Sequence, residues 1–527
     1  SVWPLWDGTN RAFVSWTICR YQTADPASLP QPCDDNTVAD PLAIEAAPAY
    51  SVMVYDFSTG NLSPILLQEP GMMYTDVVVA RPRGMPSWIL DQAAAGAADA
   101  TLTAEQAGIL HIRSVYDIDG VDLYNYAALA DPGITTSAAA RPARFIRVYK
   151  ATAIPDEETL DFDNSAFGVT RAFGMREIIG YAPVEPDGSV MVKVPADVPL
   201  AIDVLDSQGR RLAGFSRHQN WLQVRPGEVR ECNGCHNPSS PGISHGRSDS
   251  FAPVNAGAPF DGYIFPNTAL GTSSNEGETM AATRARYCSF PSSGCNALDL
   301  SVSLVYEDVW TDTSSLTADP AVPATLAYDG LDGIDGLLTD FPEYDTSKCE
   351  PWTVECLVII NYEEHIQPLW EVARDAIDPD PLATVKSCIG CHAQRDAAGV
   401  LIDPDARGQL ELTSIPSDQD ANQYKSYREL LSGDTREVLN GDMLDIATQP
   451  GVDADGNPID IPIAIGSPLS INGAAASPMF FQRFVTDMGT VSHNGWLSDA
   501  ELLLIAEWLD LGAQYFNDPF NPAVPLN

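Results

Sequence analysis

Two segments of the chain contain the pattern Cys-x-x-Cys-His, at residues 232–236 and 388–392. This pattern is the attachment signature of haem c, in which two thiols bond to the porphyrin vinyl groups and the adjacent imidazole binds the iron. In one helical turn, positions i, i+3 and i+4 share a side, so both sulfurs and the ligand nitrogen can reach one macrocycle. The residues that we expect to hold two haem c groups are Cys232, Cys235, His236, Cys388, Cys391 and His392.

Two other chemistries use closely spaced cysteines. A zinc knuckle needs four convergent ligands at each site, and a thioredoxin-like redox pair does not need a histidine directly after its second cysteine. Both segments carry that histidine. Haem attachment is therefore favoured over zinc binding and over dithiol chemistry.

The second axial ligand decides what each iron can do, because a six-coordinate iron passes electrons while an open position can bind a small molecule. For the second haem, His493 is the first candidate, since it lies just before the last predicted helix. Met488 stands five residues earlier and competes with it, and His365 is a further alternative. A His–Met pair would raise the reduction potential.

For the first haem, His218 is the first candidate for the distal ligand and His245 is the second. Nine residues separate His245 from His236, and a segment of that length spans up to roughly 30 Å when extended, enough to round the porphyrin edge. The competing interpretation is structural, because a lone histidine is often a hydrogen-bonded core or loop residue.

Two acidic turns have the alternating carboxylates of calcium-binding loops. One contains Asp117 and Asp119, and the other contains Asp453 and Asp455. Neither completes an EF-hand, and solvated turns of this composition are common in so acidic a chain. Calcium is thus a second candidate ligand after haem.

Six of the ten cysteines lie outside the haem motifs and fall into three pairs of near neighbours. The simplest expectation is three local disulfides, Cys19–Cys33, Cys288–Cys295 and Cys349–Cys356, with buried free thiols as the alternative. Disulfides and haem c together predict an oxidising compartment, either the periplasm or the cell exterior.

The charge balance is strongly acidic, with 29 Lys and Arg against 72 Asp and Glu and a formal net charge of −43. Such a surface repels nucleic acid and anionic lipid and favours basic partner proteins or metal cations. No run of 18 apolar residues occurs, so we expect no membrane insertion. Because the chain begins at Ser1 without a signal pattern, we expect a mature or truncated product.

A chain of 527 residues is too long for one compact core. The predicted fold class is multidomain α+β. We expect a β-rich, propeller-like remnant with a linker at 1–140 and a β-sandwich-like domain at 141–230. A loop-rich region with the first haem follows at 231–345, and a helical cytochrome c domain with the second haem at 346–527.

The pattern of apolar residues supports these parts. Strands are predicted at 12–18, 50–56, 75–80, 145–149 and 200–205, with a hairpin at 180–195 around residues 186–188 and a hairpin turn at 58–61. The first three resemble one propeller blade, but no second copy follows. Helices are predicted at 276–286, 363–375, 383–393, 422–431, 478–486 and 498–512. Ser498 and Glu501 form a capping box before one apolar face of the last helix.

With its motifs placed, the chain resembles the family of dihaem cytochromes related to the hydrazine synthase alpha subunit. The segments that carry the resemblance are 6–11, 111–117, 180–183, 218–222, 225–228, 277–280 and 506–510. The resemblance implies a propeller, then a middle domain with the first haem, then a helical domain with the second. Most of the propeller is absent from this sequence.

The resemblance also bears on the two irons. In hydrazine synthase, a tyrosine four residues after the first motif histidine binds the iron and frees it for catalysis. The matching position here is Ser240, which cannot act as a phenolate ligand, so ligation by His236 is implied. The bis-histidine pattern of the second haem carries over to His392 and His493.

Two functions are consistent with these features. The first is a dihaem cytochrome without catalytic residues, which transfers electrons to redox partner proteins or to copies of itself; repeated subunits could form a conducting filament. The second is a haem enzyme, like the hydrazine synthase alpha subunit, that acts on a small nitrogen or oxygen compound at a five-coordinate first haem. The state of the iron above His236 distinguishes them.

Overall fold

The structure is a computed structural model in which the chain forms two compact units, Ser1–Leu90 and Asp91–Asn527. We call them the N-terminal unit and the large unit. The residues that the structure describes are 1–23, 25, 27–69, 71–80, 99–122, 141–156, 158–159, 164–215, 217–218, 221–236, 252–265, 273–288, 298–306, 310, 324–326, 346–374, 387–488 and 491–519.

The N-terminal unit is built on one antiparallel four-stranded sheet. Its strand order is β1 (Val2–Pro4), β2 (Arg11–Trp16), β6 (Ser51–Asp56) and β7 (Leu62–Leu66). The predicted hairpin turn is confirmed, because the Asp56 carboxylate accepts the N–H groups of the two residues that open the turn at 58–59. Such aspartate turns reverse the chain between paired strands.

The predicted strand at 75–80 is wrong. These residues run beside the start of β1, but the contact goes through a side chain. Ser1 Oγ donates to the carbonyl oxygen of Thr75 at 2.6 Å and accepts from the N–H of Val77 at 3.2 Å. The backbone groups that a ladder would use are therefore bonded to a hydroxyl, and no strand forms.

A second, three-stranded sheet completes the N-terminal unit. It consists of β3 (Arg20–Gln22), β4 (Gln31–Pro32) and β5 (Ile44–Glu45), and helix α1 (Asp35–Ala39) lies between the last two in sequence. The structure joins Cys19 to Cys33, as predicted, with Cα atoms 5.4 Å apart.

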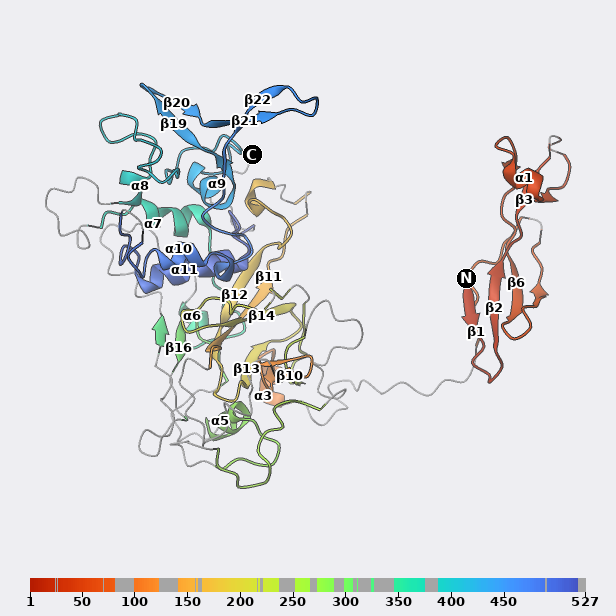
Figure 1. Cartoon of the computed structure of the whole chain (residues 1–527). Helices are drawn as coiled ribbons and strands as arrows, with labels where there is room; N and C mark the ends of the chain where they lie inside the picture. The colour runs from red at the N-terminus through yellow and green to blue at the C-terminus, as the bar shows by residue number, and fades with distance from the viewer. Residues whose placement is uncertain are drawn as a thin grey trace. The chain divides into compact units, whose positions relative to one another are not determined.

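The large unit contains two three-stranded sheets (Figure 1). In one, β11 (Phe145–Ala151) lies between β12 (Arg176–Pro183) and β14 (Leu200–Leu205), antiparallel to both. In the other, β8 (Ala107–Ile112) pairs antiparallel with β13 (Val190–Pro195) and parallel with β15 (Val229–Cys232).

Apolar residues of both sheets join one hydrophobic core, which continues into the C-terminal residues up to Tyr515. This arrangement confirms the β-rich character predicted for the middle of the chain. The same core also includes residues of β8, although β8 lies in the part of the chain, 1–140, that was predicted to be a propeller-like remnant with a linker.

The remaining elements of the large unit are short. Before residue 345 they are α3 (Ala100–Ala104), β9 (Asp117–Ile118), β10 (Val121–Asp122), η2 (Asn164–Phe167), α5 (Met280–Cys288), β16 (Leu304–Tyr306) and β17 (Ala324–Leu326). None of the helices in the described parts of the chain is both long and apolar enough to cross a bilayer.

The C-terminal part was predicted to be helical, and its helices are shorter than expected. They are α6 (Thr346–Cys349), the π-helical turn η4 (Tyr362–Ile366), α7 (Gln367–Glu371), α8 (Cys388–Cys391), α9 (Lys425–Leu431), η5 (Ala474–Ala476), α10 (Pro478–Gln482) and α11 (Asp499–Leu511). The predicted helix at 383–393 is described only from residue 387 onward.

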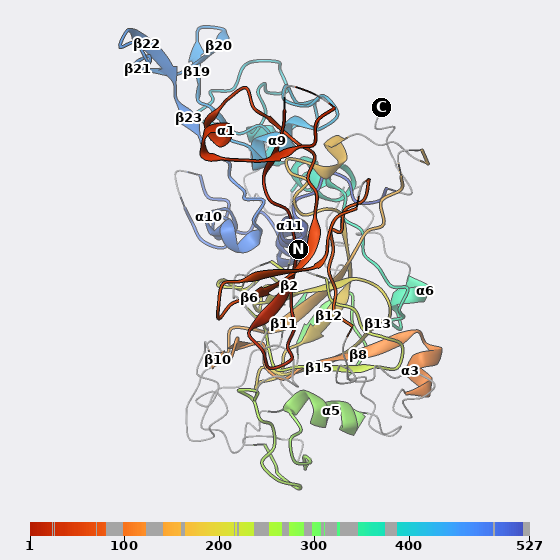
Figure 2. The same ribbon diagram turned by 90° about the vertical axis from the view of Figure 1, so that its right-hand side faces the viewer.

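Strands that were not predicted occupy the stretch between α9 and α10. They are β18 (Asp434–Thr435), β19 (Glu437–Asn440), β20 (Met443–Ile446), β21 (Thr448–Val452), β22 (Pro458–Pro462) and β23 (Ala464–Ile465). The hairpins β19–β20 and β21–β22 project from the end of the large unit away from β8 (Figures 1 and 2). Asn440-Gly441 and Asp455-Gly456 are hairpin-turn dipeptides, so this part of the chain is mixed rather than helical.

The last helix, α11, begins as the sequence predicted. Ser498 Oγ accepts from the N–H of Glu501, and a Glu501 carboxylate oxygen accepts from the N–H of Ser498 at 2.7 Å, which completes the capping box. The apolar residues of the predicted face are buried, and so is every other residue from Ala500 to Leu511.

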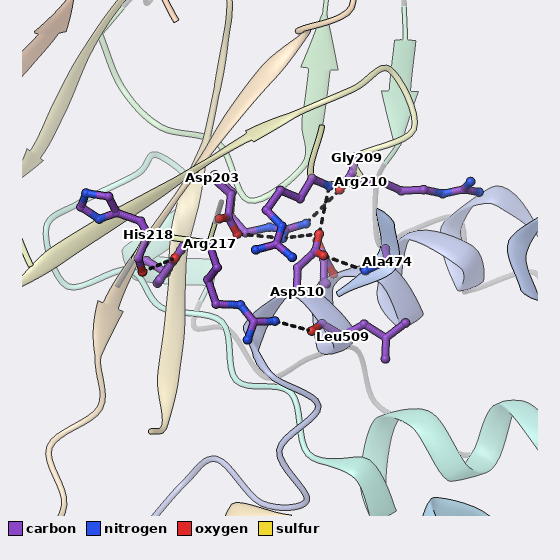
Figure 3. Close-up of polar contacts among 12 residues, drawn as sticks. Asp203, Gly209, Arg210, Arg217, His218, Ala474, Leu509 and Asp510 are labelled. Atoms are coloured by element: carbon purple, nitrogen blue, oxygen red, sulfur yellow. Dashed lines mark hydrogen bonds and ion pairs between the residues drawn. The ribbon is translucent and has the colours of Figure 1, made fainter. Parts of the chain in front are cut away.

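Three of the four acidic residues of α11, Glu501, Glu507 and Asp510, are buried because basic or hydroxyl partners meet them. Asp510 accepts from Arg147 on β11 at 3.1 Å, and also from the N–H groups of Arg211 and Ala474 (Figure 3). Arg147 also has Asp203 at 3.8 Å, and both of these side chains are fully buried. Charges that leave water together in this way must compensate one another.

Replacing Asp510 with asparagine should destabilise the large unit by about 3 kcal/mol, because Arg147 would lose its closer counter-ion in the core. The free energy of unfolding from denaturant titration measures the loss. Asp499→Asn, the same change at an exposed position of the same helix, should cost less than about 1 kcal/mol. Equal losses in the two variants would show that the buried pair has no special role.

Candidate haem-binding sites

The first Cys-x-x-Cys-His segment directly follows strand β15. This strand runs parallel to β8, with Cys232 in register with Ile112. Beyond Cys232 the backbone bonds to the turn that follows β8: Ser114 N–H donates to the Asn233 carbonyl, and Cys235 N–H donates to the Asp117 carbonyl at 2.8 Å. The expected helical turn is therefore wrong for this motif, because its backbone groups pair with a neighbouring segment.

Gly234 is the residue that permits this close approach. A Cβ atom at this position would lie 2.4 Å from the Asp117 carbonyl oxygen and 2.8 Å from that of Ser114. Both are backbone atoms that cannot rotate away, so only glycine fits between the two cysteines without displacing the turn.

The structure brings His218 to His236. Their ring centroids are 6.2 Å apart, with 72° between the ring planes. An imidazole nitrogen lies about 2 Å from a bound metal ion, so two rings that share one metal from opposite sides have centroids roughly 6 Å apart. Burial first, and then the neighbouring His236 and Arg176, lower the pKa of His218 to about 4. A neutral imidazole is the form that binds metal.

The second motif has the helical turn that the sequence predicted, since α8 covers Cys388–Cys391 and the His392 N–H donates to the Cys388 carbonyl. His392 Nδ1 lies 2.8 Å from the Arg407 carbonyl oxygen. A carbonyl only accepts, so Nδ1 carries the proton and Nε2 keeps a free lone pair. Burial lowers the pKa of His392 to about 4, despite the opposing effect of this bond.

His493 is the histidine that the structure brings to His392. Their ring centroids are 6.0 Å apart, with 35° between the planes, and Phe484 packs edge-on against His493. Burial, followed by the charge of Arg483, lowers the pKa of His493. Within the described part of the chain, the Nδ1 atoms of both His493 and His218 are buried without a hydrogen-bond partner.

The other predicted ligands are placed differently. Met488 lies on the segment that leads to His493, and His365 Nδ1 accepts the N–H of Asn361 at 2.8 Å, within the turn that starts η4. His245 and Ser240 lie outside the described residues. His111 has both ring nitrogens engaged, with Glu231 at 3.2 Å and Thr279 at 2.9 Å.

The two acidic turns do not assemble a cation site. Asp117 is fully buried, and its carboxylate accepts from the N–H groups of Gly120 and Val254. Asp453 likewise accepts from the N–H groups of Asp455 and Asn457. Within the described ranges, no three His, Cys, Asp or Glu side chains converge as a metal ion would require. Calcium therefore has no support from this geometry.

The cysteines divide as the motifs suggest. Cys349 is joined to Cys356, whereas Cys232, Cys235, Cys388 and Cys391 form no disulfide among the described residues. The predicted partner of Cys288, Cys295, lies outside the described residues. The donor sets of both sites, two thiols and two facing imidazoles each, fit haem c.

Gly234→Ala should reduce covalent haem at the first motif, because the added methyl group pushes the Cys235-His236 pair away from the 114–117 turn. The haem content per chain, from the pyridine haemochrome spectrum and the intact mass, should fall towards that of the second motif alone. Gly466→Ala is the control, since no atom lies within 4 Å of the position that its added methyl group would occupy. Unchanged haem content in Gly234→Ala would contradict this role of the glycine.

Comparisons with known proteins place the first motif in a recognised domain. Residues 143–237 match the hydrazine synthase alpha subunit middle domain. Hydrazine synthase subunit alpha of Kuenenia stuttgartiensis is 24% identical over 355 residues, which are 66% of this chain and 34% of that protein. The chain therefore spans much less than two thirds of this relative's length.

A solved structure of Kuenenia stuttgartiensis hydrazine synthase is also similar. The match has a TM-score of 0.42 and 16% identity, and it covers 99% of this chain and 56% of that chain. The matched residues include His218 and the first haem motif, which consists of Cys232, Cys235 and His236. On the middle-domain match and the sequence identity, the chain is related to the alpha subunit of hydrazine synthase.

Proposed function

We propose that this chain is a dihaem c-type cytochrome that transfers electrons through two bis-histidine haems. Cys232 and Cys235 would tether the first haem and Cys388 and Cys391 the second. His218 and His236 would ligate the first iron, and His392 and His493 the second.

The observation that carries this proposal is the pairing of imidazoles. Each motif histidine lies beside another histidine, at centroid distances of 6.2 and 6.0 Å. The partner comes 18 residues before His236 and 101 residues after His392. The two histidine pairs therefore have nearly the same distance between ring centroids. This is the distance that one metal ion between two imidazoles requires. With both axial positions filled, no coordination site is left for a substrate.

The protein's own groups would keep these ligands in the right form. The Arg407 carbonyl holds the His392 ring in the tautomer whose Nε2 is free. Burial keeps the imidazoles of His218 and His392 neutral at physiological pH, because it lowers the pKa of each to about 4. Haem, when bound, supplies an iron that alternates between the ferric and ferrous states. A fixed pair of imidazoles suits that change, because the same ligands serve both states.

The disulfides and the net charge of the chain support a location and partners that suit electron transfer. The local disulfides support a periplasmic or extracellular location. The net charge of −43 favours redox partner proteins with basic surfaces. Copies of the chain are also candidate partners, and repeated subunits would extend the electron path along a filament.

The relation to hydrazine synthase favours a second candidate function. In that case the chain would be a haem enzyme acting on a small nitrogen or oxygen compound, with the first iron five-coordinate. The matched middle domain includes the first motif, so this haem is where catalysis would occur. His218 would then have to leave the iron open, although its ring faces His236.

Removing either distal histidine should change one haem only. In His218→Ala and in His493→Ala, half of the haem should become high-spin and bind carbon monoxide, while the other half stays low-spin, because each substitution empties one axial position. Optical and EPR spectra of the purified, fully loaded protein measure both fractions.

His111→Ala is the matched control, because His111 is a buried histidine whose two nitrogens bind Glu231 and Thr279. It should leave both haems low-spin. If His218→Ala keeps the wild-type spectrum, His218 is not the ligand. If the unmodified protein already has a high-spin first haem that binds carbon monoxide, the enzyme is the better assignment.

A further inference from the structure

His218 lies in a segment without regular secondary structure, between β14 and the β-bridge that Leu222 forms with Leu200. A ligand on such a segment is held only by side-chain and backbone contacts made around it. The contacts that fix residues 217 and 218 are therefore the ones that set where the imidazole points.

Arg217 ties this segment to the end of α11. Its Nη2 donates to the Leu509 carbonyl at 3.1 Å and to the Ile471 carbonyl at 3.0 Å, and its guanidinium stacks on Phe173. The Leu509 carbonyl also accepts from the N–H of the C-cap residue Gly512. Because the last turn of a helix carries its negative dipole end, a guanidinium is well matched to this carbonyl. In Figure 3 the His218 imidazole points away from this contact.

Arg176 holds the next residue. Its Nη1 donates to the His218 carbonyl at 3.3 Å and to Tyr149 Oη at 3.0 Å, and Tyr149 Oη in turn lies 3.4 Å from the same carbonyl. The rings of Tyr149 and Trp221 flank the guanidinium, with centroids at 5.1 and 5.3 Å. The carbonyl of the distal ligand is thus bound by two donors from the β11–β12 pair.

Arg176 is itself rigidly placed. It is 3% exposed, its Nε donates to the Phe173 carbonyl at 2.9 Å, and its backbone N–H donates to Asn517 Oδ1 at 3.0 Å. Among the described residues, no carboxylate forms an ion pair with it. Its Nη1 is thereby held where it donates to the His218 carbonyl.

We propose that Arg176 is a positioning residue for the distal ligand of the first haem: by holding the His218 carbonyl, together with Tyr149, it keeps the imidazole facing His236. The inference rests on the proposed bis-histidine ligation. A metal–nitrogen bond is only about 2 Å long, and a misplacement of about 1 Å is enough to disable a site built from such contacts. Releasing the carbonyl should therefore release the ligand.

The test compares full-length, haem-loaded variants by optical and EPR spectroscopy, carbon monoxide binding and redox titration. In Arg176→Met, the first haem should become high-spin, bind carbon monoxide at one site per chain, and shift in potential, while the second haem is unchanged. Millimolar imidazole should restore the low-spin spectrum, because a free ligand does not need the segment. Tyr149→Phe should show a smaller high-spin fraction.

Arg210→Met is the matched control. Arg210 also stacks on an aromatic ring, that of Phe481 at 4.2 Å. Arg210 is not one of the described residues that bond to residues 217 and 218. It should keep both haems low-spin. Should Arg176→Met fail to fold, Arg176→Lys and Tyr149→Phe decide, since each weakens the carbonyl contact with less change in volume.

The inference is overturned if folded Arg176 variants and Tyr149→Phe all keep a low-spin first haem that excludes carbon monoxide. That result, with His218→Ala still producing a high-spin haem, would leave the proposed function standing. A high-spin first haem in the unmodified protein, or no effect of His218→Ala, would instead refute the bis-histidine assignment itself.

Discussion

The buried ion pair between Arg147 and Asp510 is the contact on which the large unit depends. It joins β11, in the middle of a sheet, to the last helix, and both side chains are excluded from water. Two other acids of this helix also have buried partners. Glu507 accepts a hydrogen bond from Tyr181 on β12, and Glu501 forms an ion pair with Arg374 at 2.7 Å. A helix with these acids could not be buried on all sides unless each acid met its partner.

The two proposed distal ligands lie on segments attached to opposite ends of this helix. His493 precedes its N-cap, Ser498, by five residues, and the segment with His218 is bound to the Leu509 carbonyl near its C-terminus. A helix of 13 residues is roughly 20 Å long at 1.5 Å per residue. Displacement of α11 would therefore disturb both iron sites, whereas loss of Arg176 would disturb one.

The sequence was sufficient to predict the features that depend on local chemistry. The capping box at Ser498 and Glu501 and the Asp56 turn need only a few neighbouring residues, and short-range hydrogen bonding specifies them. His218 and His493 were chosen by position and ligand type. Their ring centroids lie 6.2 and 6.0 Å from those of the motif histidines, and iron ligation by them stays a prediction.

Features that depend on distant partners were not predictable in this way. The first motif is not helical because its backbone pairs with residues 114–119, more than a hundred positions earlier. The burial of α11 on its polar side was not predicted, because it requires Arg147, 363 residues away, to neutralise Asp510. The hairpin β19–β20 could have been predicted from the dipeptide Asn440-Gly441, which is typical of hairpin turns. We predicted a helical domain there instead.

Near-infrared magnetic circular dichroism combined with EPR on the unmodified, fully loaded protein tests the central claim most directly, because together they identify the axial ligands of each ferric haem. We predict two low-spin haems, both with bis-histidine ligation, and no carbon monoxide binding after reduction. A high-spin first haem, or a histidine–methionine signature at either site, would contradict the pairing of His218 with His236 and of His392 with His493.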